Sequence, residues 1–273
     1  MDAIKRNDTV RQIVVIVTFV GTLVVNYLSN ALPLNGMTAG EVSDAVYNYF
    51  TPANFAFSVW GLIYLGLTGF VIYQALPSQR DNPMMRRVGY PFALTSVLNG
   101  VWLFAWHYEY FVLSVVLMGA LLATLLMIYV RLDLGLPADK RRLDFSNWAD
   151  RWLVHIPFSL YTAWITVATV ANVAGTLVYY EWSGWGISGP VWSVIMMGIA
   201  TLITGAVLIF RRNLAHGGVV VWALVAISVG QTAVSLVSNA AIVYAVIVAM
   251  VALFGWYRTR PQAKETGYQP VTT

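Results

Sequence analysis

Residues 52–74 read PANFAFSVWGLIYLGLTGFVIYQ, a stretch without a single charged side chain. A helix needs about 20 apolar residues to cross a bilayer, so this stretch is long enough. It also opens with Pro52 and Asn54, and it places Trp60 and Tyr64 one helical turn apart on one face. A helix that faces lipid on all sides does not need such a face. We therefore predict that the segment crosses the membrane and that Trp60 lines a pocket, with Tyr64 as a further ligand-binding candidate beside it.

The composition of the whole chain has the same character. Of its 273 residues, 59% are hydrophobic and 10% are charged, and the mean hydropathy is +0.68. Because a soluble domain carries about 25% charged residues, too little polar surface remains here to cover a water-soluble globule. The sequence predicts an all-α integral membrane protein. It contains no cysteine, which excludes disulfides, thiolate metal sites and cysteine nucleophiles.

Eight segments are apolar and long enough to be candidate membrane spans. They cover residues 12–32, 53–76, 87–107, 110–132, 152–179, 188–210, 218–235 and 238–257. The last two come from one continuous apolar run over residues 219–257, which is too long for a single helix. We predict the turn that divides this run at residues 235–239, which read SLVSN.

The basic residues orient these spans, since cytoplasmic loops are rich in lysine and arginine. All sixteen Lys and Arg residues lie at the N-terminus, in the loops after the second, fourth and sixth spans, or at the C-terminus. Eight spans with both termini in the cytoplasm account for this distribution. The sequence pI of about 9.3 is then a signal of topology, which argues against nucleic-acid binding. We predict a multi-pass protein of the cell membrane.

Two loops and the C-terminal tail are too polar to span. The outer loop, residues 33–51, ends in Tyr-Asn-Tyr-Phe. It is either a lid over the outer face or part of the aromatic belt at the membrane–water interface, and the sequence does not choose between them. The inner loop, residues 133–151, is predicted to be a solvated and partly helical connector. Residues 261–273 are predicted to be disordered.

The predicted spans lack the residues that most membrane chemistry needs. Away from the span ends they contain no Asp, Glu, Lys or Arg, whereas ion-coupled carriers usually hold such groups in mid-membrane. This argues against coupled transport but leaves a facilitative carrier open. The three histidines lie near predicted helix ends on opposite sides, so we expect no metal site. The spans contain no obvious residues for acid–base catalysis, so the sequence argues against an enzyme but leaves the question open.

Aromatic and amide side chains instead reach into the outer half of the bilayer from three spans. At 1.5 Å per residue, Trp60 lies about 10 Å from the outer end of its span. Asn99 and Trp102 lie about 12 and 8 Å from the outer end of theirs. Asn172 lies about 10 Å deep and Trp164 about 20 Å deep in the fifth span. These residues are therefore candidates to meet at one place.

The helical spacing supports such a meeting. Trp164, Ala168 and Asn172 are spaced i, i+4, i+8 and form one stripe. A buried amide without a partner is costly, so Asn99 and Asn172 should face protein or a cavity. Together these residues predict a cavity with flat aromatic walls for a planar, mostly apolar ligand with a few polar groups. The alternative is that each asparagine only bridges helices, which is common in helix bundles.

The same residues carry a resemblance to a known family. The chain reads VWGLIY at 59–64, LNGVW at 98–102 and YTAW at 161–164, followed by Ala168 and Asn172. In this order and spacing, the motifs resemble those of the tryptophan-rich sensory proteins related to the mitochondrial translocator protein, also called the peripheral benzodiazepine receptor. The resemblance covers about residues 12–180. The chain is similar to a long form of that family with extra C-terminal helices.

The resemblance implies a clockwise bundle of five helices whose pocket binds tetrapyrroles, sterol-like lipids and certain drugs. Carried over to this sequence, the residues lining that pocket are Trp60, Asn99, Trp102, Tyr161, Trp164, Ala168 and Asn172. Some members of the family degrade porphyrins photochemically with tryptophans that match Trp60 and Trp164. The chain departs from the family where a W-x-P-P stretch is reduced to the single Pro52.

These observations divide the chain into a translocator-like core (residues 1–180), an additional three-helix segment (residues 181–260) and the tail. The extra helices could cap the bundle, form a homodimer face or build a second site. The favoured function is a membrane binding or sensory protein for a tetrapyrrole or sterol-like lipid. The alternatives are a facilitative transporter of such molecules and a light-dependent porphyrin-degrading enzyme. The bilayer and the small ligand are the expected partners. No cofactor is expected to be required, and a tetrapyrrole is the candidate bound molecule.

Overall fold

The computed structural model describes residues 2–32, 34–136, 140, 142 and 147–257. Every regular element in these ranges is a helix, which confirms the predicted all-α class. Seven of the described helices are long and apolar enough to cross a membrane. The chain is therefore a multi-helix membrane protein.

Eight long helices account for most of the described chain. They are α1 (Asp2–Ala31), α3 (Val59–Ala75), α4 (Pro83–His107), α5 (Phe111–Arg131), α7 (Ile156–Tyr179), α8 (Gly189–Arg211), α9 (Leu214–Gly230) and α10 (Ser235–Tyr257). Two short α-helices lie in the connections, α2 (Ala39–Ala45) and α6 (Trp148–Asp150). The remaining helical turns are Leu34–Gly36, Asn54–Ser58, Pro77–Gln79, Arg151–His155 and Gly184–Gly186.

A helix stands at each of the eight predicted spans, but one of them is short. Helix α9 has 17 residues, which corresponds to a length of about 25 Å. The hydrocarbon core of a bilayer is about 30 Å thick, so α9 reaches across it only at the lower limit of span length. Seven spans meet the requirement for length. The eighth crossing, and with it the cytoplasmic position of both termini, stays a prediction.

The predicted position of the last turn is wrong. Helix α9 ends at Gly230 and α10 begins at Ser235, so the turn comprises residues 231–234 and the whole of 235–239 is helical. Polar residues can lie inside α10 because they find partners on α9. The Ser238 hydroxyl donates a hydrogen bond to the Ser228 carbonyl at 2.9 Å. The turn itself contains Gln231, whose buried side chain bonds to a distant segment, as described below.

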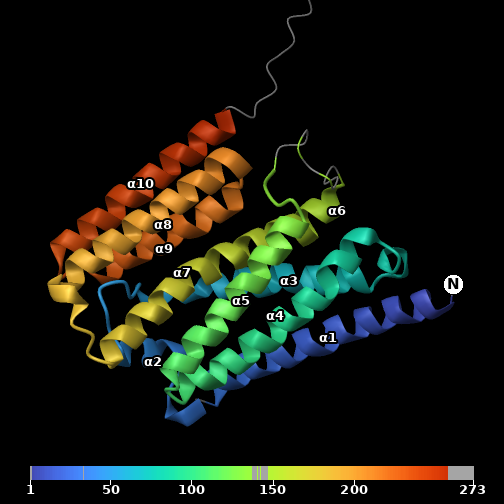
Figure 1. Ribbon diagram of the computed structural model, residues 1–273, viewed down its shortest axis with the longest axis horizontal. Helices are drawn as coiled ribbons and strands as arrows, with labels where there is room; N and C mark the ends of the chain where they lie inside the picture. The colour runs from blue at the N-terminus through green and yellow to red at the C-terminus, as the bar shows by residue number, and fades with distance from the viewer. Residues whose placement is uncertain (1, 33, 137–139, 141, 143–146, 258–273) are drawn as a thin grey trace, which may run out of the picture.

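The long helices form a closed ring with a three-helix unit beside it. Around the ring, α1 packs on α3, α3 on α7, α7 on α5, α5 on α4, and α4 on α1. Helices α8, α9 and α10 pack on one another and join the ring through the contact of α9 with α7. Figure 1 shows this unit beyond α7, on the side away from α1. The five ring helices are those of the predicted core.

Helix α3, which carries Trp60, packs closely against α7, which carries Trp164. A Cβ atom on Gly66 would lie 3.0 Å from the Pro157 side chain, so only glycine fits comfortably there. Residues Arg151–His155, which end two positions before Pro157, form a π-helical turn. A widened turn next to a proline accommodates the ring that an ordinary helix would exclude. The two helices thus approach closely enough for their tryptophans to meet.

Different interactions stabilise the outer loop and the inner loop. In the outer loop, α2 begins with a capping box in which the Thr38 hydroxyl and the Glu41 carboxylate bond to each other's backbone N–H groups. In the inner loop, the buried Asp133 carboxylate accepts hydrogen bonds from the Arg142 side chain, the shortest at 2.7 Å, and from its backbone N–H at 2.9 Å. The Arg142 guanidinium holds the pKa of Asp133 below its usual value. The predicted disordered tail, residues 261–273, lies outside the described residues.

Candidate functional site

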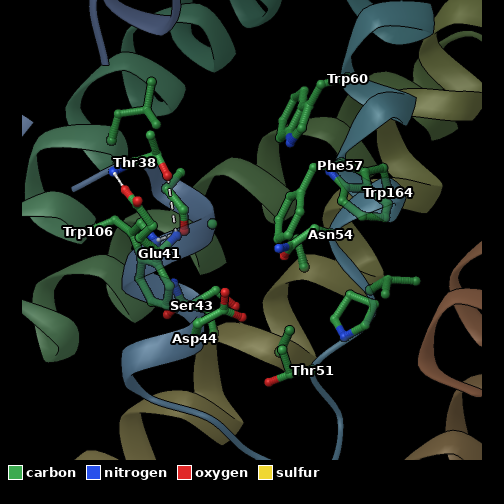
Figure 2. Close-up of a pocket in the computed structure, with 18 of the residues that line it drawn as sticks. Thr38, Glu41, Ser43, Asp44, Thr51, Asn54, Phe57, Trp60, Trp106 and Trp164 are labelled. Atoms are coloured by element: carbon green, nitrogen blue, oxygen red, sulfur yellow. Dashed lines mark hydrogen bonds between the residues drawn. The ribbon is translucent and has the colours of Figure 1, made fainter. Parts of the chain in front are cut away.

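A cavity of about 780 Å³ lies at the end of the ring that carries α2. Its walls come from α1, α2, the segment 48–57, α3, α4, α7 and α9. A volume of this size is in the range of small-molecule sites in proteins. Figure 2 shows the hollow between α2 and α4 on one side and α3 with the preceding segment on the other.

Six of the eight site residues proposed from the sequence line this cavity. They are Trp60, Tyr64, Trp102, Trp164, Ala168 and Asn172. The other two, Asn99 and Tyr161, are not part of its lining. They are 1% and 2% exposed and lie behind the aromatic wall, in contact with the residues that form it.

The wall formed by α3 and α7 is aromatic. Trp60 stacks on Tyr64 with their ring centroids 5.1 Å apart and an angle of 19° between the planes. Trp164 meets Trp60 edge to face at 6.3 Å, and Phe57 meets Trp164 in the same manner at 6.2 Å. Such pairs stabilise one another by about 0.5–1.5 kcal/mol beyond their buried area. The rings therefore form a fixed surface rather than independent side chains (Figure 2).

The opposite wall joins α4 to the outer loop. Trp102 stacks on Trp106 with centroids 5.9 Å apart. The Trp106 indole N–H donates to the backbone carbonyl of Ala39 at 3.1 Å, which fastens the start of α2 to α4. Val42 of α2 is fully buried in the small cluster that contains Trp106. The loop that the sequence presented as either a lid or an aromatic belt thus supplies part of the cavity wall.

Asn99 joins its own helix, α4, to three others behind the aromatic wall. Its side-chain oxygen accepts hydrogen bonds from Asn26 of α1 at 3.1 Å and from the Tyr64 hydroxyl of α3 at 3.3 Å. Its amide nitrogen donates to the Tyr161 hydroxyl of α7 at 3.4 Å. For Asn99, then, the helix-bridging interpretation of the sequence describes the observed geometry. The bond to Asn99 also fixes the Tyr64 ring, on which Trp60 stacks.

Asn172 differs from Asn99, because the nitrogen of its side-chain amide has no hydrogen-bond partner among the described residues. Its side-chain oxygen accepts from the Ser114 hydroxyl at 3.1 Å, but its N–H₂ group is buried and unpaired. The indole N–H groups of Trp102 and Trp164 are likewise buried and without an acceptor among the described residues. All three residues line the cavity. A buried donor without an acceptor is unfavourable, so each of these three side chains would gain from an acceptor atom brought within its reach.

The rim carries negative charge. Of the described residues that line the cavity, Glu41 and Asp44 are the charged ones, and none is lysine, arginine or histidine. The Glu41 carboxylate accepts a hydrogen bond from the Thr38 backbone N–H at 2.6 Å. This bond lowers the pKa of Glu41 below its usual value. Both acidic residues come from α2, so the outer loop provides the electrostatics of the opening.

The C-terminal helices also take part in the site. Ala223 and Ile227 of α9 line the cavity directly. The Ala53 backbone N–H donates to the Ala226 carbonyl of α9 at 2.9 Å, and the Trp222 indole N–H donates to the Ala56 carbonyl at 3.1 Å. Helix α9 thereby fixes the segment that leads into α3 and carries Phe57.

Sequence reasoning missed the contributions of α1, α2 and α9. The Thr38-x-x-Glu41 pattern is the signature of a capping box and could have predicted a helix start within the outer loop. Asn26 and Asn30, one turn apart in the first span, also line the cavity and were visible as polar residues in an apolar segment. Ala223 and Ile227 gave no such signal, because α9 is apolar all round.

Fold and site together define a multi-helix membrane protein with an aromatic cavity of ligand size at one end. The chain belongs to the TSPO-like family: a family model described as TSPO-like protein matches residues 12–254. This confirms the resemblance inferred from the three motifs and extends the matched region through most of α10. Comparison with curated proteins and with solved structures gave no match. Membership indicates a ligand-binding or sensory role in the membrane in broad terms.

Proposed function

We propose that the protein binds a planar, largely apolar ligand in this cavity, as a binding or sensory protein of the cell membrane. A tetrapyrrole is the first candidate and a sterol-like lipid the second. The observation that carries the proposal is that an indole wall and three side chains with unpaired, buried N–H groups all line one cavity of about 780 Å³. A flat ligand with acceptor atoms would satisfy both features.

In this proposal the aromatic wall binds the flat face of the ligand. The Trp60–Tyr64 stack is held from behind by Asn99, so little side-chain freedom is lost when a ring packs against it. Trp164 and Asn172 would orient the polar edge through their free N–H groups. Because α2 contributes one wall, movement of α2 would govern entry of the ligand.

Binding can be tested with a neutral planar probe, the dimethyl ester of protoporphyrin IX, and the detergent-purified full chain. The probe's own absorbance band is followed, because the chain contains eleven tryptophans and two are to be replaced. The variant Trp60→Phe with Trp164→Phe removes two indole contacts of about 0.5–1.5 kcal/mol each. The two losses sum to about 1–3 kcal/mol, so we expect binding to be weaker by about fivefold or more, since 1.4 kcal/mol corresponds to a factor of ten.

The matched control replaces two tryptophans away from the cavity. Trp148 and Trp152 are 68% and 50% exposed beside the inner loop, so Trp148→Phe with Trp152→Phe should leave the affinity unchanged. Equal affinities of the two double variants would contradict the proposal. Flux assays in proteoliposomes add a second readout. Binding without flux supports a binding or sensory role, whereas sustained flux of the ester would replace it with transport.

A further inference from the structure

The cavity has two ends of different chemistry. Glu41 and Asp44 stand on the α2 side, across the hollow from Phe57, Trp60 and Trp164 (Figure 2). The unpaired N–H groups of Trp164 and Asn172 belong to side chains that are each 3% exposed. The exposed rim thus carries carboxyl groups, and the buried part carries hydrogen-bond donors.

The negative charge at the rim is not neutralised within the described part of the chain. The ion pairs found there involve other acidic residues, namely Asp8, Asp81 and Asp133. Glu41 bonds to the backbone and hydroxyl of Thr38, neither of which carries charge. An opening lined by charges of one sign raises the local concentration of ligands of the opposite sign. It equally disfavours a ligand that brings carboxylates of its own.

The aromatic side chains of the cavity reinforce this preference. Phe57, Trp60 and Trp106 line the same cavity as the two carboxyl groups. The faces of aromatic rings attract ammonium groups, whether protonated or quaternary. A cation held between a carboxylate and an aromatic face therefore gains two favourable interactions, and an anion in the same place gains neither.

We propose that the cavity selects a planar aromatic cation: a ring body with an acceptor atom for the buried N–H groups, and an amine or quaternary ammonium at the α2 rim. This inference rests on the proposed function and adds the charge of the ligand to it. It also implies that a tetrapyrrole with two free carboxylates is a poor ligand, whereas its neutral or cationic derivatives are good ones.

Three derivatives of one macrocycle, which differ in the charge of their two side-chain ends, test the preference for a cation. The probes are protoporphyrin IX as the free dicarboxylic acid, its dimethyl ester, and its diamide with two quaternary ammonium ends. We expect the cation to bind about tenfold more tightly than the dianion at low ionic strength, with the ester between them. The ratio should shrink towards one in 0.5 M salt, because both carboxyl groups are exposed and screened.

The decisive variant is Glu41→Gln with Asp44→Asn in the full chain. Glutamine at the third position of a helix still completes a capping box, so α2 should keep its fold. The three affinities should converge while that of the ester stays unchanged. The matched control, Glu109→Gln with Glu181→Gln, removes two exposed carboxyl groups that do not line the cavity. It should keep the preference for the cation.

The outcomes separate this inference from the proposed function. Saturable binding of all three probes with equal affinity, or tighter binding of the dianion, would overturn the charge preference and leave the binding role intact. A preference that persists in the Glu41→Gln, Asp44→Asn variant would show that these carboxyl groups do not set it. Absence of saturable binding by any of the three probes would overturn both proposals.

Discussion

The side-chain amide of Gln231 donates a hydrogen bond to the backbone carbonyl of Thr51 at 2.9 Å, across 180 residues of sequence. The same nitrogen lies 3.3 Å from the Asn48 carbonyl, and the Gln231 oxygen accepts from the Tyr47 hydroxyl at 2.6 Å. Gln231 follows α9 directly and is 1% exposed. One residue of the C-terminal unit thus fixes the segment that closes the cavity on this side.

Replacing Gln231 should therefore weaken ligand binding from outside the cavity. In Gln231→Leu, the Thr51 carbonyl loses its donor, while the Asn48 carbonyl keeps the bond from the Thr51 backbone N–H at 3.0 Å. An unpaired buried group costs about 1–3 kcal/mol. We expect the segment to loosen and the affinity for the protoporphyrin dimethyl ester to fall several-fold. Equilibrium binding to the detergent-purified chain measures the effect, and thermal unfolding reports how much of it reflects general destabilisation.

The neighbouring position provides the control. Thr232 is exposed and lies one residue further along the same turn, so Thr232→Val should change neither affinity nor stability. If Gln231→Leu lowered the unfolding temperature and left the affinity unchanged, the C-terminal unit would support the fold but not the cavity.

The close approach of α9 to the same segment makes a second prediction. A Cβ atom on Gly230 would lie 2.7 Å from the backbone nitrogen of Ala53 and 3.1 Å from the carbonyl carbon of Pro52. Backbone atoms cannot move aside as a flexible side chain can. We expect Gly230→Ala to destabilise the protein by about 1–3 kcal/mol, as overpacking does. Thermal unfolding in detergent measures it.

Gly205 in α8 is the matched comparison, since nothing lies within 4 Å of a Cβ atom added there. Alanine is the better helix former by about 1 kcal/mol, so Gly205→Ala should be neutral or stabilising. Equal effects of the two substitutions would show that contact with residues 52–53 is not what requires glycine at position 230.

Much of the fold and part of the site could be predicted, because contact with lipid restricts the composition of a span and the helical period restricts the spacing of residues on one face. Charged residues avoid the spans, so the apolar runs revealed the long helices. The helical period placed Trp164, Ala168 and Asn172 on one face, and all three line the cavity. Those inferences depend on spacing within one helix, which the sequence contains in full.

The remainder depends on contacts between helices, which spacing does not reveal. Asn99 and Asn172 are the same residue type at similar predicted depth, yet both the oxygen and the nitrogen of the Asn99 amide have partners, whereas the Asn172 nitrogen has none among the described residues. The turn before α10 was misplaced because polar residues suggested it, whereas Ser238 finds its partner on α9. Ala223 and Ile227 face the cavity from a helix without a polar face, so no periodic contrast marked them.

The Asp133–Arg142 pair should make stability depend on pH in the acid range. The pKa of Asp133 lies below its usual value because of the hydrogen bonds from Arg142. Its contribution to stability is therefore complete above about pH 3.9, the pKa of an unfolded aspartate, and is lost as the pH falls through the lower folded value. Asp133 has a positive φ of 52°, which asparagine also tolerates, so Asp133→Asn isolates the charge.

Unfolding temperatures of the native chain and of Asp133→Asn, measured from pH 7 to pH 2, test this. The native chain should be the more stable one at pH 5–7 by a constant margin, and the margin should narrow below about pH 4. A margin that stays constant to pH 2, or that grows as the pH falls, would show that the carboxylate charge does not stabilise the inner loop.

The contrast between the two asparagines gives the last prediction. In Asn99→Ala, the amide of Asn26 and the hydroxyl of Tyr64 lose their shared acceptor, and the Tyr161 hydroxyl loses its donor. The Asn26 amide keeps its bond to the Thr22 carbonyl at 2.9 Å, but the hydroxyls of Tyr64 and Tyr161 lose the partner that joined them to α4. We therefore expect a loss of about 2 kcal/mol or more in stability.

In Asn172→Ala, by contrast, only the bond from Ser114 is broken, and that hydroxyl still donates to the Phe111 carbonyl at 2.8 Å. The substitution should cost little stability but weaken binding of a ligand whose acceptor atom uses the free Asn172 amide. Thermal unfolding and ester binding on the same two samples separate the effects. If both variants lost stability equally and affinity equally, the unpaired amide of Asn172 would have no role towards a ligand, and both asparagines would act only as bridges between helices.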